Sequence, residues 1–102
     1  MSVTARILPK AAFITFSREN VILDGILDGI NQIFKLPGGD KAINQPPNIQ
    51  IKFYRNGVRQ HPGSGNDYEV TESGGPGTGY DTFTINPPPI SGEILLVDYI
   101  II

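Results

Sequence analysis

The chain has 102 residues, a length typical of a single domain, with 12 glycines, 9 prolines and no cysteine. Isoleucine, valine and threonine outnumber alanine and leucine, which excludes a helical bundle, and the missing cysteine excludes disulfides and thiolate chemistry. The formal net charge of −2 and the lack of a ~20-residue apolar run argue against nucleic acid and membranes as partners.

The chain opens with two apolar segments that no turn signal joins. Residues 3–8 alternate in polarity and are stopped by Pro9, which predicts a short strand. A second apolar stretch follows over 12–17. Because nothing returns these segments to each other as a hairpin, residues 1–20 are predicted to form an arm or a swapped strand.

A tandem repeat of Ile-Leu-Asp-Gly occupies residues 22–29. Its four-residue period would suit a helix, but a glycine at every fourth position opposes one. We therefore expect a turn at Asp28-Gly29 that leads into a strand over 32–36. The proline and two glycines that follow should end this strand and begin a long loop that reaches residue 48.

The second half of the chain is typical of strands separated by turns. Ile49, Ile51 and Phe53 alternate with polar residues, which is the pattern of a half-buried strand. Asn56-Gly57 follows and is the strongest short signal for a tight hairpin turn. Further strands are predicted over 67–71, 80–86 and 93–102, separated by a turn at 62–65, a glycine-rich loop at 73–79 and three prolines at 87–89.

Turns that recur about every 8–12 residues are typical of an all-β sandwich or barrel. The sequence therefore predicts a small antiparallel β-sandwich or barrel over residues 21–102, with residues 1–20 as an N-terminal extension. Asp67 is suited to close the loop before its strand by accepting backbone N–H bonds. Gly92 permits a chain reversal after the three prolines.

Five segments occur in a fixed order: DGINQIFKL at 28–36, FYRNGVRQ at 53–60, NDYEV at 66–70, FTINPP at 83–88 and GEILLVDY at 92–99. Together they resemble a small β-sandwich module of tailed-bacteriophage virion proteins, and the resemblance covers about seventy per cent of the chain. The loop over 73–79 is longer than that pattern needs, and the first 27 residues have no counterpart in it. The resemblance implies a structural or attachment role in a phage particle.

No residue is expected to act in catalysis or to hold a cofactor or metal. His61, the single histidine, lies in a turn and has no sequence partner for acid–base work. The loop over 74–79 lacks the Lys-Ser/Thr pair and the following helix of a phosphate-binding loop. The aspartates are spread along the chain without the spacing of a calcium-binding loop.

Two sets of residues are candidates for contact with partners. One set could form a surface that stacks on a sugar or pairs with an acidic partner, and it consists of Tyr54, Arg55, Arg59 and Tyr80. The alternative is an ordinary hairpin whose polar face contacts only solvent. A subunit interface would consist of Phe13, Ile14, Phe16, Ile100, Ile101 and Ile102. The last four residues are apolar on both strand faces, which suits either an interface or a buried central strand.

These features favour a non-enzymatic structural component of a tailed-phage particle, such as a head-decoration, neck or tail-attachment protein. Its expected partners are other virion proteins (major capsid, neck or tail proteins) and further copies of itself. It is expected in the virion, assembled in the host cytoplasm. One alternative is a carbohydrate-binding or host-attachment module that uses Tyr54, Tyr80 and the glycine-rich loop, and a weaker one is a small hydrolase.

Overall fold

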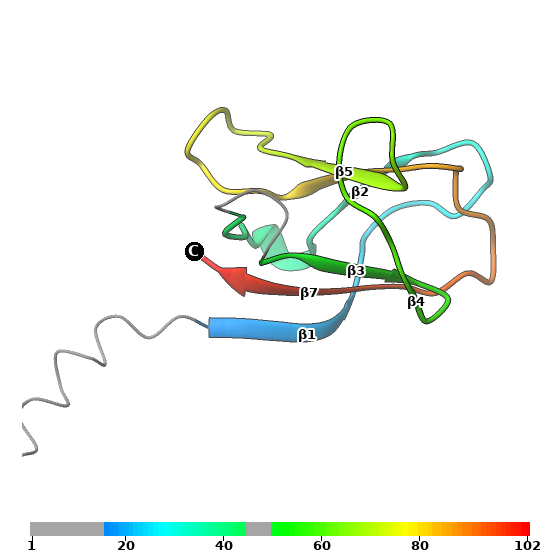
Figure 1. Ribbon diagram of the computed structural model, residues 1–102, viewed down its shortest axis with the longest axis horizontal. Coiled ribbons are helices and arrows are strands. Elements are labelled where there is room, and N and C mark those ends of the chain that lie inside the picture. The colour runs from blue at the N-terminus through cyan, green and yellow to red at the C-terminus, as the bar shows by residue number, and fades with distance from the viewer. Residues whose placement is uncertain (1–15, 45–49) are drawn as a thin grey trace, which may run out of the picture.

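The computed structural model describes residues 16–44 and 50–102, which form a sandwich of two antiparallel sheets (Figure 1). Its elements are β1 (Phe16–Ile22), β2 (Ile33–Lys35), the 3-10 helix η1 (Pro37–Gly39), β3 (Lys52–Arg55), β4 (Val58–Arg59), β5 (Tyr68–Thr71), β6 (Thr82–Ile85) and β7 (Leu95–Ile101). One sheet has the order β1-β7-β3-β4 and the other has the order β2-β6-β5. The predicted all-β sandwich is confirmed. Among these residues no helix is long and apolar enough to span a membrane.

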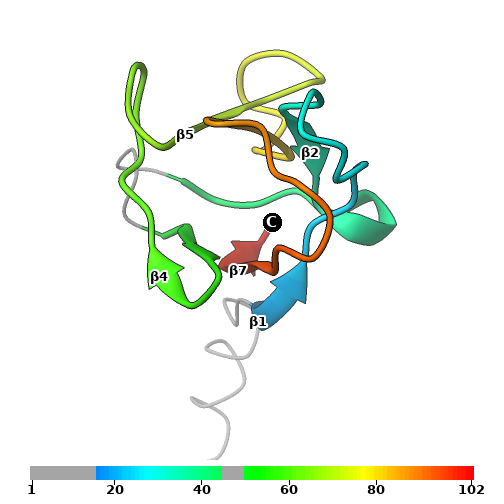
Figure 2. The same cartoon turned by 90° about the vertical axis from the view of Figure 1, so that its right-hand side faces the viewer.

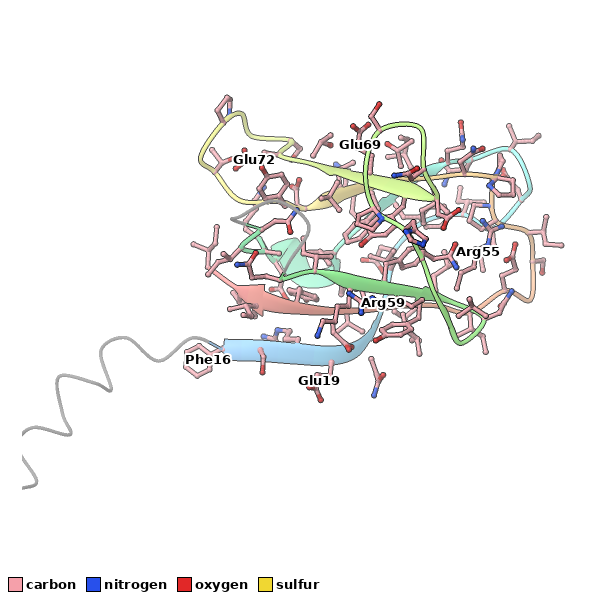
Figure 3. All side chains as sticks on the ribbon, in the orientation of Figure 1. Phe16, Glu19, Arg55, Arg59, Glu69 and Glu72 are labelled. Carbon is pink, nitrogen blue, oxygen red and sulfur yellow. The ribbon has the colours of Figure 1, made fainter. Side chains whose placement is uncertain are left out.

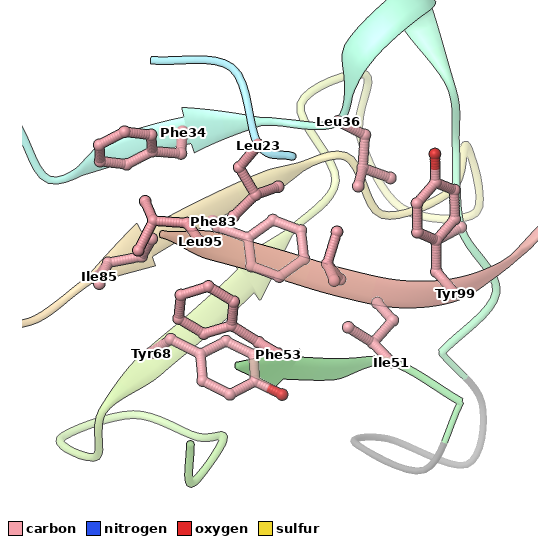
Figure 4. Close-up of a cluster of buried hydrophobic side chains, with 12 residues drawn as sticks. Leu23, Phe34, Leu36, Ile51, Phe53, Tyr68, Phe83, Ile85, Leu95 and Tyr99 are labelled. Atoms are coloured by element: carbon pink, nitrogen blue, oxygen red, sulfur yellow. The ribbon is translucent and has the colours of Figure 1, made fainter. Parts of the chain in front are cut away.

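The core lies between the two sheets and is built from side chains that alternate inward along their strands. The four-stranded sheet and its flanks contribute Leu23, Ile51, Phe53, Leu95, Val97 and Tyr99. The three-stranded sheet and its flanks contribute Phe34, Leu36, Tyr68, Phe83 and Ile85 (Figure 4). The predicted inward positions of Ile51 and Phe53, and the shared face of Phe83 and Ile85, are therefore confirmed.

Three aromatic rings connect the two sheets at the centre of the core. Phe53 of β3 meets Tyr68 of β5 edge to face, with ring centroids 5.1 Å apart. Phe83 of β6 lies 5.9 Å from Phe53 and stacks on Tyr68 at 5.8 Å. Each such pair contributes beyond the burial of its area, so this cluster ties the layers together.

The predicted turns form where glycine and asparagine tolerate a positive φ. Asn56 and Gly57 have φ values of 53° and 83° and join β3 to β4 in a tight hairpin. At the other predicted turn Gly29 has a φ of 78°, while Asp28 Oδ1 accepts hydrogen bonds from the backbone N–H groups of Ile30 and Asn31. Both turn predictions are confirmed.

Two loop predictions are also confirmed. The His61 N–H donates to Asp67 Oδ2 at 2.9 Å, so the aspartate closes the loop before β5. Gly92 has a φ of 93° at the reversal that leads into β7. Asp67 provides an acceptor for a backbone N–H of the loop, and Gly92 adopts a positive φ that residues with a side chain take only at an energetic cost.

The edge of the four-stranded sheet is formed by β1, because β7 lies between β1 and β3. The β1–β7 register shifts between Arg18 and Val21, where Asn20 has a φ of 55° and donates its N–H to Asp98 Oδ1. This irregularity and the charges of Arg18 and Glu19 discourage pairing of the exposed edge with another strand.

The predicted boundary between residues 20 and 21 falls inside β1, since Phe16 already pairs with β7 of the same chain. The strand expected over 3–8 and most of the stretch over 12–17 lie outside the described residues. The strand expected over 93–102 is present as β7, with buried side chains on its inner face and half-buried ones on its outer face.

Candidate functional site: an exposed apolar corner

The predicted interface residues that the structure describes lie at one corner of the sandwich. Phe16 of β1 stands opposite Ile101 of β7, Ile100 stands opposite the next residue of β1, and Ile102 follows directly. Figure 3 shows Phe16 at the outer end of β1. We call these four residues the Phe16 corner: Phe16, Ile100, Ile101 and Ile102. Phe13 and Ile14 lie outside the described residues.

The Phe16 corner combines exposed and anchored side chains. Phe16 is 69% exposed and Ile102 is 67% exposed, whereas Ile100 and Ile101 are half-buried and Ile101 packs against the core. The exposed pair therefore presents apolar area to solvent from a firmly held backbone. Exposed apolar area at a fixed place on a protein is a common feature of contact surfaces.

Residues 41–43 form hydrogen bonds with the end of β7, past the last residue of β7 that pairs with β3. The Ile43 N–H donates to the Ile100 carbonyl at 2.9 Å, and the Ile102 N–H donates to the Lys41 carbonyl at 2.9 Å. Ala42 pairs at the same time with Tyr80, which links the two sheets. The backbone at the end of β7 is thus hydrogen-bonded within its own chain to residues 41–43 on one side and pairs with β1 on the other.

A tyrosine and an ion pair lie directly behind this corner. Tyr99 Oη donates to Asp40 Oδ2 at 2.6 Å, and Arg18 Nε lies 3.0 Å from the same oxygen. Burial raises the pKa of Tyr99, and its hydrogen bond to the Asp40 carboxylate raises it further. Tyr99 therefore stays protonated at neutral pH and acts as a hydrogen-bond donor that positions Asp40.

Asp81 organises the glycine-rich loop from inside the protein. Its carboxylate accepts hydrogen bonds from Lys41 Nζ at 2.7 Å, from the Ser73 N–H at 3.0 Å, from the Ser73 hydroxyl and from Thr82 Oγ1. Burial alone would raise the pKa of Asp81, but these donors outweigh burial and hold the pKa well below its usual range. The loop is therefore fixed at its base by a charged anchor.

Arg55, one of the predicted recognition residues, uses its guanidinium for hydrogen bonds within the protein. Its Nε and Nη2 atoms lie 2.6 Å and 2.8 Å from the two carboxylate oxygens of Glu93, and its Nη1 donates to the Pro87 carbonyl at 2.7 Å. Glu93 also accepts from the Ile90 N–H and from Asn56 Nδ2. The hydrogen bonds from Arg55, followed by the one from Ile90, lower the pKa of Glu93 to about 2.

The Arg55–Glu93 pair predicts a measurable acid dependence. The folded-state pKa of Glu93, about 2, is below its ordinary value of 4.5, so its contribution is complete above pH 4.5 and is lost as the pH falls toward 2. We expect Glu93→Gln to lower the free energy of unfolding by about 2 kcal/mol at pH 7 and by much less at pH 2.5. Urea denaturation at both pH values measures this difference.

The matched control is Glu69→Gln, which removes an exposed glutamate on β5. It should change the free energy of unfolding by less than about 0.5 kcal/mol at either pH. An equal loss at both pH values for Glu93→Gln would contradict the electrostatic role of this carboxylate.

The other predicted recognition residues are divided between two places. Tyr54 and Arg59 are cross-strand partners on the β3–β4 hairpin, and Tyr54 is half-buried on the outer face. Tyr54 pairs with Leu96, whereas Tyr80 lies beside Ala42, which bridges to Ile101. Leu96 and Ile101 are five residues apart along β7, which corresponds to about 16 Å. Tyr80 therefore does not share a surface with Tyr54 and Arg59.

The sequence patterns did not indicate a second apolar area at the opposite end of the sandwich. It consists of Ile22, Ile26, Ile30, Ile90 and Ile94, each 56–82% exposed, and we call it the isoleucine end. One signal was available: Ile26, Ile30 and Ile90 stand in turn-forming segments beside glycine, aspartate or proline, where a large apolar side chain has no strand face to fill.

Comparison of the chain with protein-family models, with curated proteins and with solved structures gives no match. Within residues 16–44 and 50–102, no group of three or more histidine, aspartate or glutamate side chains is arranged to hold a metal ion. His61 is exposed in its turn, as expected from its sequence context.

Proposed function

We propose that this protein is a non-enzymatic structural component of a tailed-phage particle that acts through contacts with neighbouring subunits. The observation that carries the proposal is the Phe16 corner, where the exposed Phe16 pairs with Ile101 and the exposed Ile102 follows at the end of β7. The ordered motifs that resemble virion β-sandwich modules support the same assignment. Head decoration, neck and tail attachment are all roles of this kind.

The charged groups of the protein support a scaffold rather than a reaction centre. Asp81, Glu93 and Asp40 are each paired with a basic side chain, at 2.7 Å, 2.6 Å and 3.0 Å respectively. The Arg18–Asp40 and Arg55–Glu93 pairs each join a strand to a loop. Hydrogen-bond donors hold the pKa of Asp81 and of Glu93 below its usual range, so these two carboxylates are ionised at neutral pH. A general acid or base needs a group that exchanges protons near neutral pH, which these carboxylates do not provide.

The proposed partners are other virion proteins and further copies of this chain. An exposed phenylalanine and an exposed isoleucine on a held backbone suit a protein surface, because aromatic and apolar side chains dominate the centres of such interfaces. A contact through this corner would leave the core and both sheets unchanged. The proposed location is the virion.

The test uses the double variant Phe16→Ser and Ile102→Ser in particles of the phage that encodes this chain. Quantitative mass spectrometry of gradient-purified particles should find the wild-type chain in fixed ratio to the major capsid protein, and the variant reduced by about ten-fold or more. Both changed residues are exposed, so the thermal midpoint of the free protein should stay the same.

The matched control is Ile33→Ser, which removes an exposed isoleucine from the other sheet and should leave incorporation unchanged. Absence of the wild-type chain from intact particles would overturn the proposal. Incorporation of the double variant at the wild-type ratio would remove the Phe16 corner as the contact surface.

The second candidate function is a carbohydrate-binding or host-attachment module, which one observation favours. Tyr54 and Arg59 lie opposite each other on the outer face of the hairpin, an arrangement in which a sugar can stack on the ring and bond to the guanidinium. Binding of the isolated protein to a glycan array, abolished by Tyr54→Ala, would support this function. A blank array would leave only the structural role.

A further inference from the structure

The tight turn between β3 and β4 holds the only asparagine of the sequence that a glycine follows. In any asparagine, the side-chain amide carbon can be attacked by the main-chain nitrogen of the next residue. A side chain on that next residue hinders the attack, and glycine has none. The other asparagines precede valine, glutamine, isoleucine, aspartate or proline. Asn56-Gly57 is therefore the step of this chain at which such an attack is least hindered.

The surroundings of Gly57 leave its nitrogen open to this reaction. Asn56 and Gly57 are both exposed, and a side chain at position 57 would meet no atom within 4 Å. Among the described residues none accepts a hydrogen bond from the Gly57 N–H, so no bond has to break before the nitrogen attacks. Solvent can therefore reach this N–H group and remove its proton.

The amide of Asn56 is oriented by the segment before β7. Figure 2 looks onto this end of the sandwich, with β4 in green and the segment before β7 in orange. The Ile94 N–H donates to Asn56 Oδ1 at 2.9 Å, and Asn56 Nδ2 donates to Glu93 Oε1 at 3.1 Å. A donor at this distance from the amide oxygen stabilises the negative charge that forms there when a nucleophile adds to the carbon.

We propose that Asn56 is a site of spontaneous deamidation, at which the side-chain amide becomes a carboxylate without an enzyme. The Gly57 nitrogen loses its proton to water and bonds to Asn56 Cγ, while the Ile94 N–H stabilises the oxygen anion. The Cγ–Nδ2 bond then breaks and the nitrogen leaves as ammonia, which gives a cyclic imide. Water opens this ring to aspartate or isoaspartate, so each conversion consumes a water molecule and releases an ammonia molecule.

The new carboxylate would stand beside Glu93. In place of the Nδ2 group that now donates to Glu93 Oε1 at 3.1 Å, the aspartate presents a second anionic oxygen. Like charges this close repel, and the repulsion acts on the carboxylate that also holds Arg55 and the Ile90 N–H. Conversion of Asn56 is therefore expected to loosen the segment from Ile90 to Ile94, which carries two members of the isoleucine end.

The isoaspartate product changes the turn itself. Its main chain runs through the former side chain and is longer by one carbon atom, so the turn no longer matches the spacing of β3 and β4. Asn56 and Gly57 both have a positive φ, which two-residue hairpin turns of this type require. The inserted atom is expected to disturb the pairing of Arg55 with Val58 on either side of the turn.

The experiment ages the full chain at neutral pH in water enriched in heavy oxygen and maps its peptides by mass spectrometry over time. Each conversion replaces the amide nitrogen by labelled oxygen, which marks the product. We expect Asn56 to convert about ten-fold or more faster than Asn66, an exposed asparagine that aspartate follows. Conversion of Asn56 at or below the rate of Asn66 would overturn the proposal.

Gly57→Ala tests the attacking nitrogen directly. The added methyl group hinders the attack, so conversion of Asn56 should become about ten-fold or more slower. Gly57 has a φ of 83°, at which alanine strains the turn, so the same comparison is repeated in urea with both chains unfolded. Equal rates for the glycine and alanine chains in either condition would overturn the proposed step.

Asn56→Asp supplies the aspartate product and tests its consequence. Hydrogen exchange of the Ile90 N–H, which donates to Glu93 Oε2 at 2.8 Å, should be about ten-fold faster than in the wild type. The matched control is Asn66→Asp, because the Asn66 amide donates to the Pro62 carbonyl instead, and it should leave this exchange unchanged. Wild-type exchange at Ile90 in Asn56→Asp would overturn the proposed loosening of this segment.

Discussion

Replacing Phe53 by alanine is expected to lower the free energy of unfolding by about 3–5 kcal/mol. The side chain is fully buried, and its ring meets those of Tyr68 and Phe83 from the opposite sheet. Its removal leaves a cavity between the layers in addition to the lost transfer energy. Urea denaturation of the wild type and the variant measures the difference.

The matched control for Phe53→Ala is Phe16→Ala, which truncates a ring that is 69% exposed. This change should cost less than about 0.5 kcal/mol in the isolated protein. Because small domains are stable by about 5–15 kcal/mol, the core variant should lose a large fraction of its stability and unfold at a clearly lower urea concentration than the wild type. A loss below about 1 kcal/mol for Phe53→Ala would contradict the central position of this ring.

A chain that ends at Tyr99 is expected to lose about 3–4 kcal/mol of stability, which is the second large effect. Ile100 and Ile101 are half-buried, and Ile101 packs against the core. The truncation also removes backbone bonds to residues 41–43 and the pairing with the start of β1. Thermal melts and light scattering together separate this loss from a loss of association.

A chain that ends at Ile101 is the matched control for this truncation. It lacks only Ile102, which is 67% exposed, although the Ile102 N–H bond to Lys41 is lost with it. We expect a loss of about 1 kcal/mol or less in stability, together with weaker association. An unchanged melting temperature for the chain that ends at Tyr99 would show that Ile100, Ile101 and Ile102 do not stabilise the fold.

The turns of this protein could be predicted because each depends on neighbours in sequence. Asn56-Gly57 takes a positive φ at both residues, and Asp28 satisfies N–H groups only two and three residues away. Asp67 reaches a donor six residues back. Such signals act locally, so the sequence pattern is sufficient to find them.

The strand order could not be predicted, because it depends on segments far apart in the chain. The almost wholly apolar sequence of β7 indicates a strand that is largely buried, but not that β1 and β3 flank it. For the same reason the pairing of Arg55 with Glu93, and the separation of Tyr80 from Tyr54, are visible only in the folded protein. Each follows from contacts across the fold.

The candidate contact residues were predicted in part. Phe16 and Ile101 were assigned to one interface from their apolar character alone, and the fold places them opposite each other. Whether they contact a partner is a proposal for experiment. The isoleucine end was not predicted, since its members come from β1, from the loop after β1 and from the segment before β7, which are far apart in sequence.

The interior position of β7 has a consequence for how fast this protein folds. Phe16 pairs with Ile101 and Phe53 pairs with Val97, so the four-stranded sheet needs contacts between residues far apart in sequence. Only the β3–β4 hairpin of that sheet is local. Closing long loops before any contact forms is entropically costly, and domains with such topology fold in milliseconds to seconds rather than in microseconds. The nascent chain therefore exposes the partner edges of β1 and β3 until β7 has been synthesised.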